Sequence, residues 1–266
     1  MSEPIQTTVP TQAERNGDFS ALLNVPKTNS CVKTFGFNCY QIFDPFSGVL
    51  NGSRVTRQPI MNNIISKDTI SSIATAYLQF YPLPNVPGDD NGHNNYLSNS
   101  VRSDTFNGEI GRLDFNLSDR NKLFWNFRHN DRIENRGNRF FNIATGNFLS
   151  RVNQGTMVDD VHTFNATTVM NVRLNWTRFI EGNSKPSEGF NATKLGLPAY
   201  VTAASPKLVL PIMDIGGGFN QLGDNGGDVT PFDIFQIFGD VVKIAGKHSL
   251  KMGTDIRELR ESSISY

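Results

Sequence analysis

The sequence predicts an all-β fold: an antiparallel transmembrane β-barrel segment of about six long strands in three hairpins, after an irregular N-terminal loop region with one short helix. Three observations support this prediction. Apolar and polar residues alternate with the period of a strand in the C-terminal part of the chain. Turns within the hairpins are short, whereas the connections between hairpins are long, as in outer-membrane barrels. Finally, no window approaches the roughly 18 consecutive apolar residues of a transmembrane helix.

Composition limits the classes of function. The chain has 266 residues, enough for one large or two small domains if it were soluble. Its 25 basic and 25 acidic residues give a net charge of zero, so we expect no nucleic-acid partner. The opening residues MSEPIQTTVPT lack the basic region and apolar stretch of a signal peptide. A mature outer-membrane protein would have lost that peptide, and a fragment would never have had one.

The first predicted region, residues 1–104, is a loop-rich insertion. Prolines interrupt residues 1–65, where a short strand is expected only around Tyr40 to Phe43. One amphipathic helix is predicted at about residues 68–80, capped by Asp68 and stopped by Pro82. Its polar face carries Ser and Thr rather than Lys and Arg, so we expect it to pack on its own loop and not on a membrane surface. A connector rich in Pro, Asn and Gly follows.

The two cysteines, Cys31 and Cys39, lie eight positions apart in a loop of this region. We favour a local disulfide formed in an oxidising compartment. Free thiols and a metal site remain as alternatives, although two ligands do not complete a metal site.

The second predicted region, residues 105–266, is a partial outer-membrane β-barrel. Its clearest hairpin runs from Gly111 to Asn130 around the polar turn Ser118 to Asn121. The second hairpin turns at Asn165 to Thr167, and the third at Ala245 to Lys247. The connections between hairpins are expected at Asp131 to Gln154 and at Glu181 to Pro231.

Alternation assigns the strand residues to two faces. The predicted lipid face consists of Leu113, Phe115, Trp125, Phe127, Val172, Leu174, Trp176, Phe235, Ile237, Val241 and Leu250. The predicted lumen face consists of Arg112, Asp114, Asn126, Arg128, Arg173, Asn175, Asp240, Asp255 and Arg257. We therefore expect Leu174→Arg to impair folding and Arg173→Leu to be tolerated. The adjacent Asp159 and Asp160 break the alternation, so one of them must face the wrong way or lie outside the membrane.

No motif indicates catalysis, and we expect no enzymatic activity, no cofactor and no metal site. The histidines His93, His129, His162 and His248 are isolated, with no H-E-x-x-H pair. The run Gly246 to Ser249 is a hairpin turn rather than a phosphate loop, because a strand and not a helix follows it. Segments 216–218 and 224–228 offer oxygen ligands for calcium, but their spacing differs from the twelve-residue calcium loop and favours a flexible loop.

Several motifs together resemble a known family. They are TTVPTQAERNGDFSALL (7–23), QIFDP (41–45), RQPIMNNII (57–65), QFYPLPN (79–85), NNYLSN (94–99), GRLDFNLSDRNKLF (111–124) and GKHSLKMGTDIREL (246–259). Each motif is loose, but their order and spacing are similar to the Oar-like branch of the TonB-dependent outer-membrane receptors. The resemblance covers most of the chain.

This resemblance implies a function and a set of partners. In such receptors a plug domain sits inside a barrel of about 22 strands, and a periplasmic energy-coupling protein of the TonB type opens the path for a solute. The chain shows no plug and no energy-coupling box, so the resemblance implies an internal piece of the barrel with a large extracellular insertion. The implied partners are outer-membrane lipid, the rest of the barrel and plug, the TonB-type protein and an unidentified solute. The implied location is the bacterial outer membrane.

Two other functions stay open at this point. A soluble or cell-surface, adhesin-like β-sandwich without transport activity would pack the aromatic faces sheet to sheet. A carbohydrate-active all-β enzyme would need two carboxylates about 5 to 10 Å apart beside a sugar site. Asp159 and Asp160 are the one local pair, and neighbouring strand residues point to opposite faces.

Overall fold

A computed structural model describes residues 4–26, 39–224 and 226–266 of the chain. These residues form two compact units. The first unit combines Met1–Val101, Gly137–Gly146 and Pro186–Asn225, and the second combines Arg102–Arg136, Asn147–Lys185 and Gly226–Tyr266. None of the described helices has the length and apolarity to cross a bilayer.

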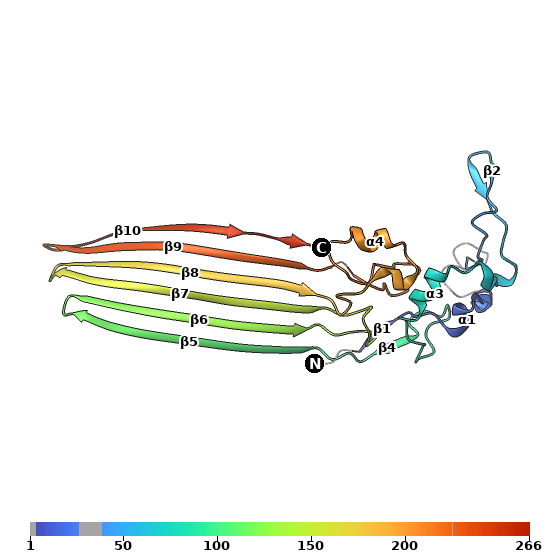
Figure 1. Ribbon diagram of the computed structural model, residues 1–266, viewed down its shortest axis with the longest axis horizontal. Coiled ribbons are helices and arrows are strands. Elements are labelled where there is room, and N and C mark those ends of the chain that lie inside the picture. The colour runs from blue at the N-terminus through green and yellow to red at the C-terminus, as the bar shows by residue number, and fades with distance from the viewer. Residues whose placement is uncertain (1–3, 27–38, 225) are drawn as a thin grey trace. The chain divides into compact units, whose positions relative to one another are not determined.

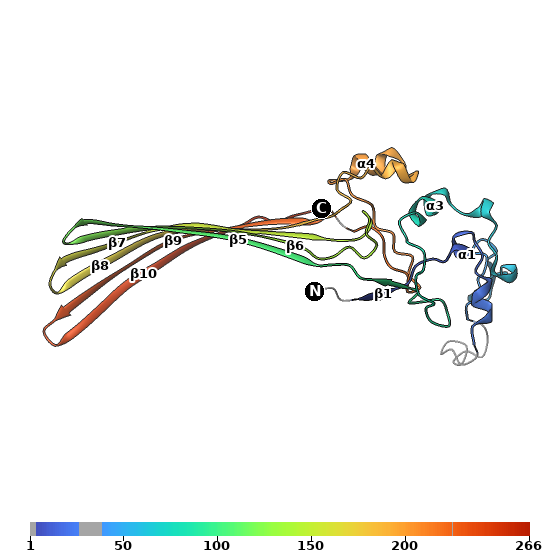
Figure 2. The same ribbon diagram turned by 90° about the horizontal axis from the view of Figure 1, so that it is seen from below.

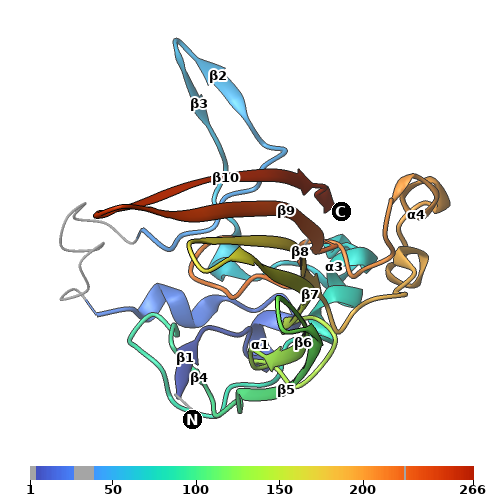
Figure 3. The ribbon, with the colours of Figure 1, turned by 90° about the vertical axis from the view of Figure 1, so that its left-hand side faces the viewer.

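The second unit is a single antiparallel sheet, which confirms the predicted all-β class (Figure 1). Its strands are β5 (Ser103–Ser118), β6 (Asn121–Asn135), β7 (Phe148–Asn165), β8 (Thr168–Ser184), β9 (Asp228–Ala245), β10 (His248–Glu261) and β11 (Ile264–Ser265). The strand order is β10-β9-β8-β7-β6-β5, so each long strand pairs with its sequence neighbour, and β11 pairs with the start of β9. Figure 3 shows this order from the side of the short turns.

The three predicted hairpin turns are confirmed, but the strands run further than expected. The long strands have 14 to 18 residues, whereas a membrane-spanning strand needs only about 9 to 11. The connections between hairpins therefore shrink to residues 136–147 and 185–227. Both long connections join the strands at one end of the sheet, and the short turns join them at the other.

The sheet is open and twisted. Figure 2 shows the strands fanning out toward the short turns, as the right-handed twist of β-strands requires. Within the described residues, β5 and β10 are the outer long strands of the sheet and have no further neighbour. Such unpaired edges expose backbone donors and acceptors, and hydrocarbon cannot satisfy these groups. A barrel built on this sheet needs further strands at both edges.

The first unit contains only short elements. They are β1 (Ile5–Thr7), α1 (Gln12–Arg15), η1 (Ser20–Asn24), β2 (Val49–Asn51), β3 (Arg54–Thr56), η2 (Met61–Asn63), η3 (Lys67–Thr69), α3 (Ser72–Leu78), β4 (Tyr96–Ser98), η4 (Ala192–Leu195) and α4 (Ala199–Ala204), where η denotes a 3-10 helix. β1 pairs with β4, and β2 pairs with β3. The strand expected around Tyr40 to Phe43 is reduced to one bridge between Phe43 and Pro59.

A shared core holds the first unit together. It is formed by Val9, Tyr77, Tyr81, Tyr96, Phe140, Ala144, Leu195, Leu210 and Leu222. These residues come from all three segments of the unit. Segments 137–146 and 186–225, which the sequence places among the barrel strands, therefore supply part of this core. Local periodicity cannot reveal this, because the contacts join residues far apart in the chain.

The predicted helix at about 68–80 is divided in two by the structure. Asp68 lies inside η3 instead of capping the longer helix, and Ser71 occupies the N-cap position of α3 without a side-chain hydrogen bond. The helix α3 buries Tyr77 in the core, while Ile73 and Leu78 pack against that core.

The N-terminus of α1 has a reciprocal capping box, formed by Thr11 and Glu14. This T-x-x-E pattern is a local sequence signature of a helix N-terminus.

Candidate functional site

A row of apolar side chains crosses the whole width of the sheet. It consists of Leu113, Trp125, Val158, Leu174, Ile237 and Ile256, which pair in register from β5 to β10. Leu113 and Leu174 are 53% and 52% exposed, and Ile256 is 62% exposed. Trp125 and Val158 are partly exposed. Single exposed apolar residues are ordinary in soluble proteins, but an uninterrupted row of exposed and partly exposed apolar residues of this width marks a surface that meets another apolar phase.

The strand pairing places every residue of the predicted lipid face on this same side, which we call the apolar face. The next row toward the short turns contains Phe115, Leu123 and Val172, and the one beyond it contains Met170, Val241 and Met252. All residues of the predicted lumen face lie on the opposite side, which we call the charged face. The alternation of the sequence therefore separated the residues of the two sides of the sheet as the structure places them.

The apolar face ends at a wholly polar row. That row consists of Glu109, His129, Gln154, Arg178, Asp233 and Arg260. The indole of Trp176 donates to Oδ1 of Asp233 at 3.1 Å, and the indole of Trp125 donates to Oγ1 of Thr156 at 2.7 Å. Indoles with an apolar body and a bonded N–H are typical of the boundary between hydrocarbon and water.

The position of this boundary explains the length of the strands. On β8 the apolar face runs from Trp176 to Thr168 beside the turn, a span of nine residues. A tilted strand needs about 9 to 11 residues to cross a bilayer. The remaining residues of each strand lie beyond the polar row, toward the long connections.

The charged face carries ion pairs between and along the strands. Arg112 binds Asp114 at 2.7 Å, and Arg257 binds Asp255 at 2.6 Å. Asp255 also accepts a hydrogen bond from Gln236 at 2.9 Å. These side chains are largely exposed, so each pair adds little to stability. Their effect is to present a hydrated surface of both charge signs directly opposite the apolar face.

A denser network lies on the charged face beyond the boundary row. Arg151 donates from Nε to Glu181 at 2.7 Å and also binds Glu134. Arg132 binds Asp104 at 2.5 Å and lies 3.4 Å from Glu134. The network joins β5, β6, β7 and β8, so it ties four neighbouring strands together where they approach the long connections.

The side chains of the two adjacent aspartates, Asp159 and Asp160, point to opposite faces of the sheet. Asp159 points to the charged face, is fully buried, and binds Nε and Nη2 of Arg173 at 2.6 and 2.5 Å. Asp160 points to the apolar face in register with Leu123 and Val172, and its Oδ1 has no hydrogen-bond partner. Asp160 is thus the residue that faces the wrong way, and it lies within the apolar band rather than outside it.

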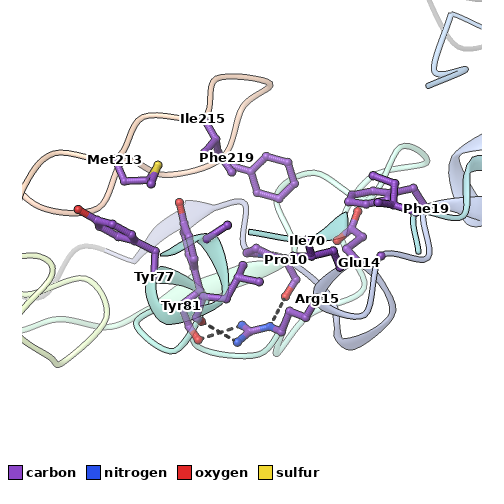
Figure 4. Close-up of a pocket in the computed structure, with 14 residues that line it drawn as sticks. Pro10, Glu14, Arg15, Phe19, Ile70, Tyr77, Tyr81, Met213, Ile215 and Phe219 are labelled. Carbon is purple, nitrogen blue, oxygen red and sulfur yellow. Dashed lines mark hydrogen bonds between the residues drawn. The ribbon is translucent and has the colours of Figure 1, made fainter. Parts of the chain in front are cut away.

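The first unit contains a pocket between α1, α3 and the loop 211–223 (Figure 4). Its volume is about 230 Å³, and apolar side chains and aromatic rings dominate its lining. Tyr77 stands on α3, Tyr81 follows just beyond its C-terminal end, and Ile215 and Phe219 reach the pocket from the loop. Sequence reasoning did not identify this pocket, because its walls come from segments more than a hundred residues apart.

Hydrogen bonds fix the walls of this pocket. The hydroxyl of Tyr77 donates to the carbonyl of Pro211 at 3.1 Å, and that of Tyr81 donates to the carbonyl of Asn220. Burial, together with the negative charge of Asp214, raises the pKa of Tyr81 to about 12. The two tyrosines therefore stay neutral and hold both ends of the loop over the helix.

Arg15 closes the other side of the pocket. Its guanidinium donates to the carbonyls of Pro10, Leu78, Tyr81 and Pro82. Three of these carbonyls lie at or just beyond the C-terminal end of α3, where backbone acceptors lack intrahelical partners. Burial lowers the pKa of Arg15. Arg15 therefore joins the segment around α1 to the C-terminal end of α3. The receptor-like motif of residues 7–23, which contains Arg15, does not indicate this role.

The remaining predictions concern the cysteines, a metal site and two glycine-containing segments. Cys31 lies outside the described residues, so its disulfide with Cys39 stays a prediction. Within the part of the chain that the structure describes, no three His, Cys, Asp or Glu side chains form a metal-binding group. Gly246 lies in the turn between β9 and β10 with a φ of +61°, as a tight hairpin turn requires. Glycines 216–218, which offered oxygen ligands for calcium in the sequence, form the tip of the pocket loop, each with a positive φ.

Comparison with known families gives one result. Residues 2–266 match the family described as outer membrane beta barrel domain. No curated protein matches the chain.

Proposed function

The chain belongs to the outer membrane β-barrel domain family, and from this membership we propose that its complete form is a TonB-dependent receptor that imports a solute. As a member of this family the chain is located in the bacterial outer membrane, where its apolar face contacts lipid. Transport, the TonB-type partner and the solute are the parts that we propose.

The charged face is the observation that carries the proposal. An outer-membrane barrel turns one face of its sheet to lipid and the other to its lumen. Here the lumen side carries Arg112, Asp114, Asp255 and Arg257 as two ion pairs. A wall of paired charges favours contact with a hydrated plug or solute, whereas a small barrel fills its interior with packed side chains.

The open edges of the sheet also support a large barrel. Further strands must join β5 and β10 before the sheet can close in a membrane. The order of the receptor-like motifs, from residues 7–23 to residues 246–259, supports the Oar-like branch of the TonB-dependent receptors. On this proposal the long connections 136–147 and 185–227 are extracellular, because short turns in such barrels are periplasmic.

The alternative functions receive less support. A β-sandwich needs a second sheet against the apolar face, and the described residues contain one large sheet and two small two-stranded ones. A carbohydrate-active enzyme needs two carboxylates at one site, and Asp159 and Asp160 point to opposite faces. We therefore propose a receptor without enzymatic activity.

The proposal can be tested with the full-length gene product in planar lipid bilayers. A receptor whose lumen is filled by a plug should show almost no ion conductance at rest. It should also bind the purified periplasmic domain of the TonB-type protein from the same organism in a surface plasmon resonance assay. Steady conductance together with no binding of that domain would identify an open pore and refute the receptor proposal.

A further inference from the structure

We propose that the pocket of the first unit binds a neutral, flat aromatic molecule of about two fused rings. The pocket belongs to one compact unit, since all of its lining residues lie in Met1–Val101 and Pro186–Asn225. The inference is independent of the proposed transport function. It assigns a ligand class to a site that is built entirely from residues of the first unit.

The size of the pocket sets the size of the ligand. A dry cavity of about 150 Å³ lined by aliphatic and aromatic side chains accepts one benzene ring. The present pocket has a volume of about 230 Å³. The ratio of these volumes leaves room for a bicyclic ring system within the pocket.

The rings that line the pocket favour a flat aromatic ligand. Phe19, Tyr77, Tyr81 and Phe219 contribute aromatic side chains from three different segments. Figure 4 shows Tyr77 and Tyr81 on one side and Phe219 on the loop across from them. Aromatic pairs in offset or edge-to-face contact gain about 0.5 to 1.5 kcal/mol beyond the burial of their area. An aliphatic chain of equal volume lacks this gain.

Most polar groups of the pocket are already bonded within the protein, which favours a neutral ligand. Oε2 of Glu14 accepts a hydrogen bond from the backbone of Thr11 at 2.7 Å. The guanidinium of Arg15 is taken up by four backbone carbonyls, and both tyrosine hydroxyls donate to the pocket loop. A ligand with a charge or several polar groups would lose its hydration without gaining these partners.

The conformation of the loop that completes the pocket is fixed by backbone hydrogen bonds and by a glycine. Met213 and Leu222 exchange two hydrogen bonds at 2.8 and 3.0 Å, which close the loop at its base. At its tip, Gly218 has a φ of +84°, and an added Cβ would lie 3.0 Å from the ring of His93. Glycine at this position lets the chain reverse, so Ile215 and Phe219 both reach the pocket.

The test is fluorine NMR of 5-fluoroindole with the full-length protein in detergent micelles. Indole is a neutral bicyclic ring, and binding should broaden the fluorine signal beyond the broadening in empty micelles. Naphthalene should displace it, whereas hexanol at the same concentration should not. Signal broadening equal to that in empty micelles, or equal displacement by hexanol, would overturn the inference.

Matched variants locate the binding. Ala74→Phe on α3 fills the pocket and should weaken binding about tenfold or more, because the added ring has no space beside a ligand. Ala203→Phe makes the same change on exposed helix α4 and should leave binding unchanged. Ile215→Trp fills the pocket from the loop, where 52% of Ile215 is exposed and a larger side chain does not strain the core. Unchanged binding in both filled variants would refute the site.

Discussion

Arg173 and Asp159 form a buried ion pair between β8 and β7, on the charged face of the sheet. Nε and Nη2 of Arg173 lie 2.6 and 2.5 Å from the same carboxylate oxygen of Asp159. The carboxylate is fully buried, whereas the side chain of Arg173 is 37% exposed. The arginine therefore keeps one side toward the lumen while it compensates a charge that water cannot reach. This pair changes the expected cost of mutating Arg173.

Arg173→Leu should destabilise the barrel by about 3 kcal/mol, because it leaves the buried carboxylate of Asp159 without a partner. Alternation alone predicted that this change would be tolerated, and the ion pair is the physical reason to revise that prediction. The free energy of unfolding can be measured by urea titration of the full-length protein in liposomes.

A double-mutant cycle separates the pair from the loss of a single side chain. Asp159→Leu together with Arg173→Leu should recover most of the lost stability, because no unpaired charge remains. Additive losses in the double variant would mean that the two residues do not interact.

Leu174→Arg should impair folding into liposomes by about 2 to 4 kcal/mol, because the new charge faces lipid inside the apolar band, one row from its middle at Val172. Asn175→Arg provides the matched control. It introduces the same side chain at the next residue, which points to the charged face, and it should fold as well as the unmodified protein. Equal folding of the two variants would contradict the assignment of the faces.

Asp160→Val should stabilise the barrel by about 1 to 2 kcal/mol, because it removes a carboxylate from the apolar face, where its Oδ1 has no hydrogen-bond partner. Asp159→Val should have the opposite effect, since it leaves Arg173 without its partner. Urea titration in liposomes measures both changes. A loss of stability in Asp160→Val would show that Asp160 binds a group in the assembled barrel.

These two aspartates mark the limit of what the sequence could predict. Period-two alternation identified both faces, because a slip of one residue would have reversed every side chain. It required one of the pair to break the pattern but could not say which, since that depends on the partner strand. The pocket could not be predicted from the sequence, because α3 and the loop 211–223 are far apart in the chain and meet only in the folded protein. Only its capping box, Thr11 to Glu14, had a local signature.

Raising the pH above 10 should lower the free energy of unfolding of the first unit. Burial and Asp214 raise the folded-state pKa of Tyr81 to about 12, above the value of about 10 expected in the unfolded chain. The stability from neutral Tyr81 is therefore fully present below pH 10 and is lost as the pH rises through 12. Absorbance at 295 nm should show a late tyrosine step.

Two variants test whether the late absorbance step comes from the ionisation of Tyr81. Tyr81→Phe should reduce this step to the contribution of Tyr77, whose pKa burial also raises, whereas Tyr200→Phe should retain the step in full, because Tyr200 is 71% exposed and lies outside the core. Complete tyrosine ionisation well below pH 12 in the unmodified protein would contradict the buried position of Tyr81.

The most direct test of the central claim is a nitroxide scan from Val172 to Trp176 in the full-length protein in lipid. Single cysteines replace each position in a background with Cys31 and Cys39 changed to serine, and paramagnetic relaxation measures their surroundings. Oxygen, which dissolves in lipid, should relax labels at 172, 174 and 176 most strongly, and a water-soluble nickel complex should relax those at 173 and 175. Equal accessibility at all five positions, or the reverse alternation, would contradict a sheet with its apolar face in the membrane.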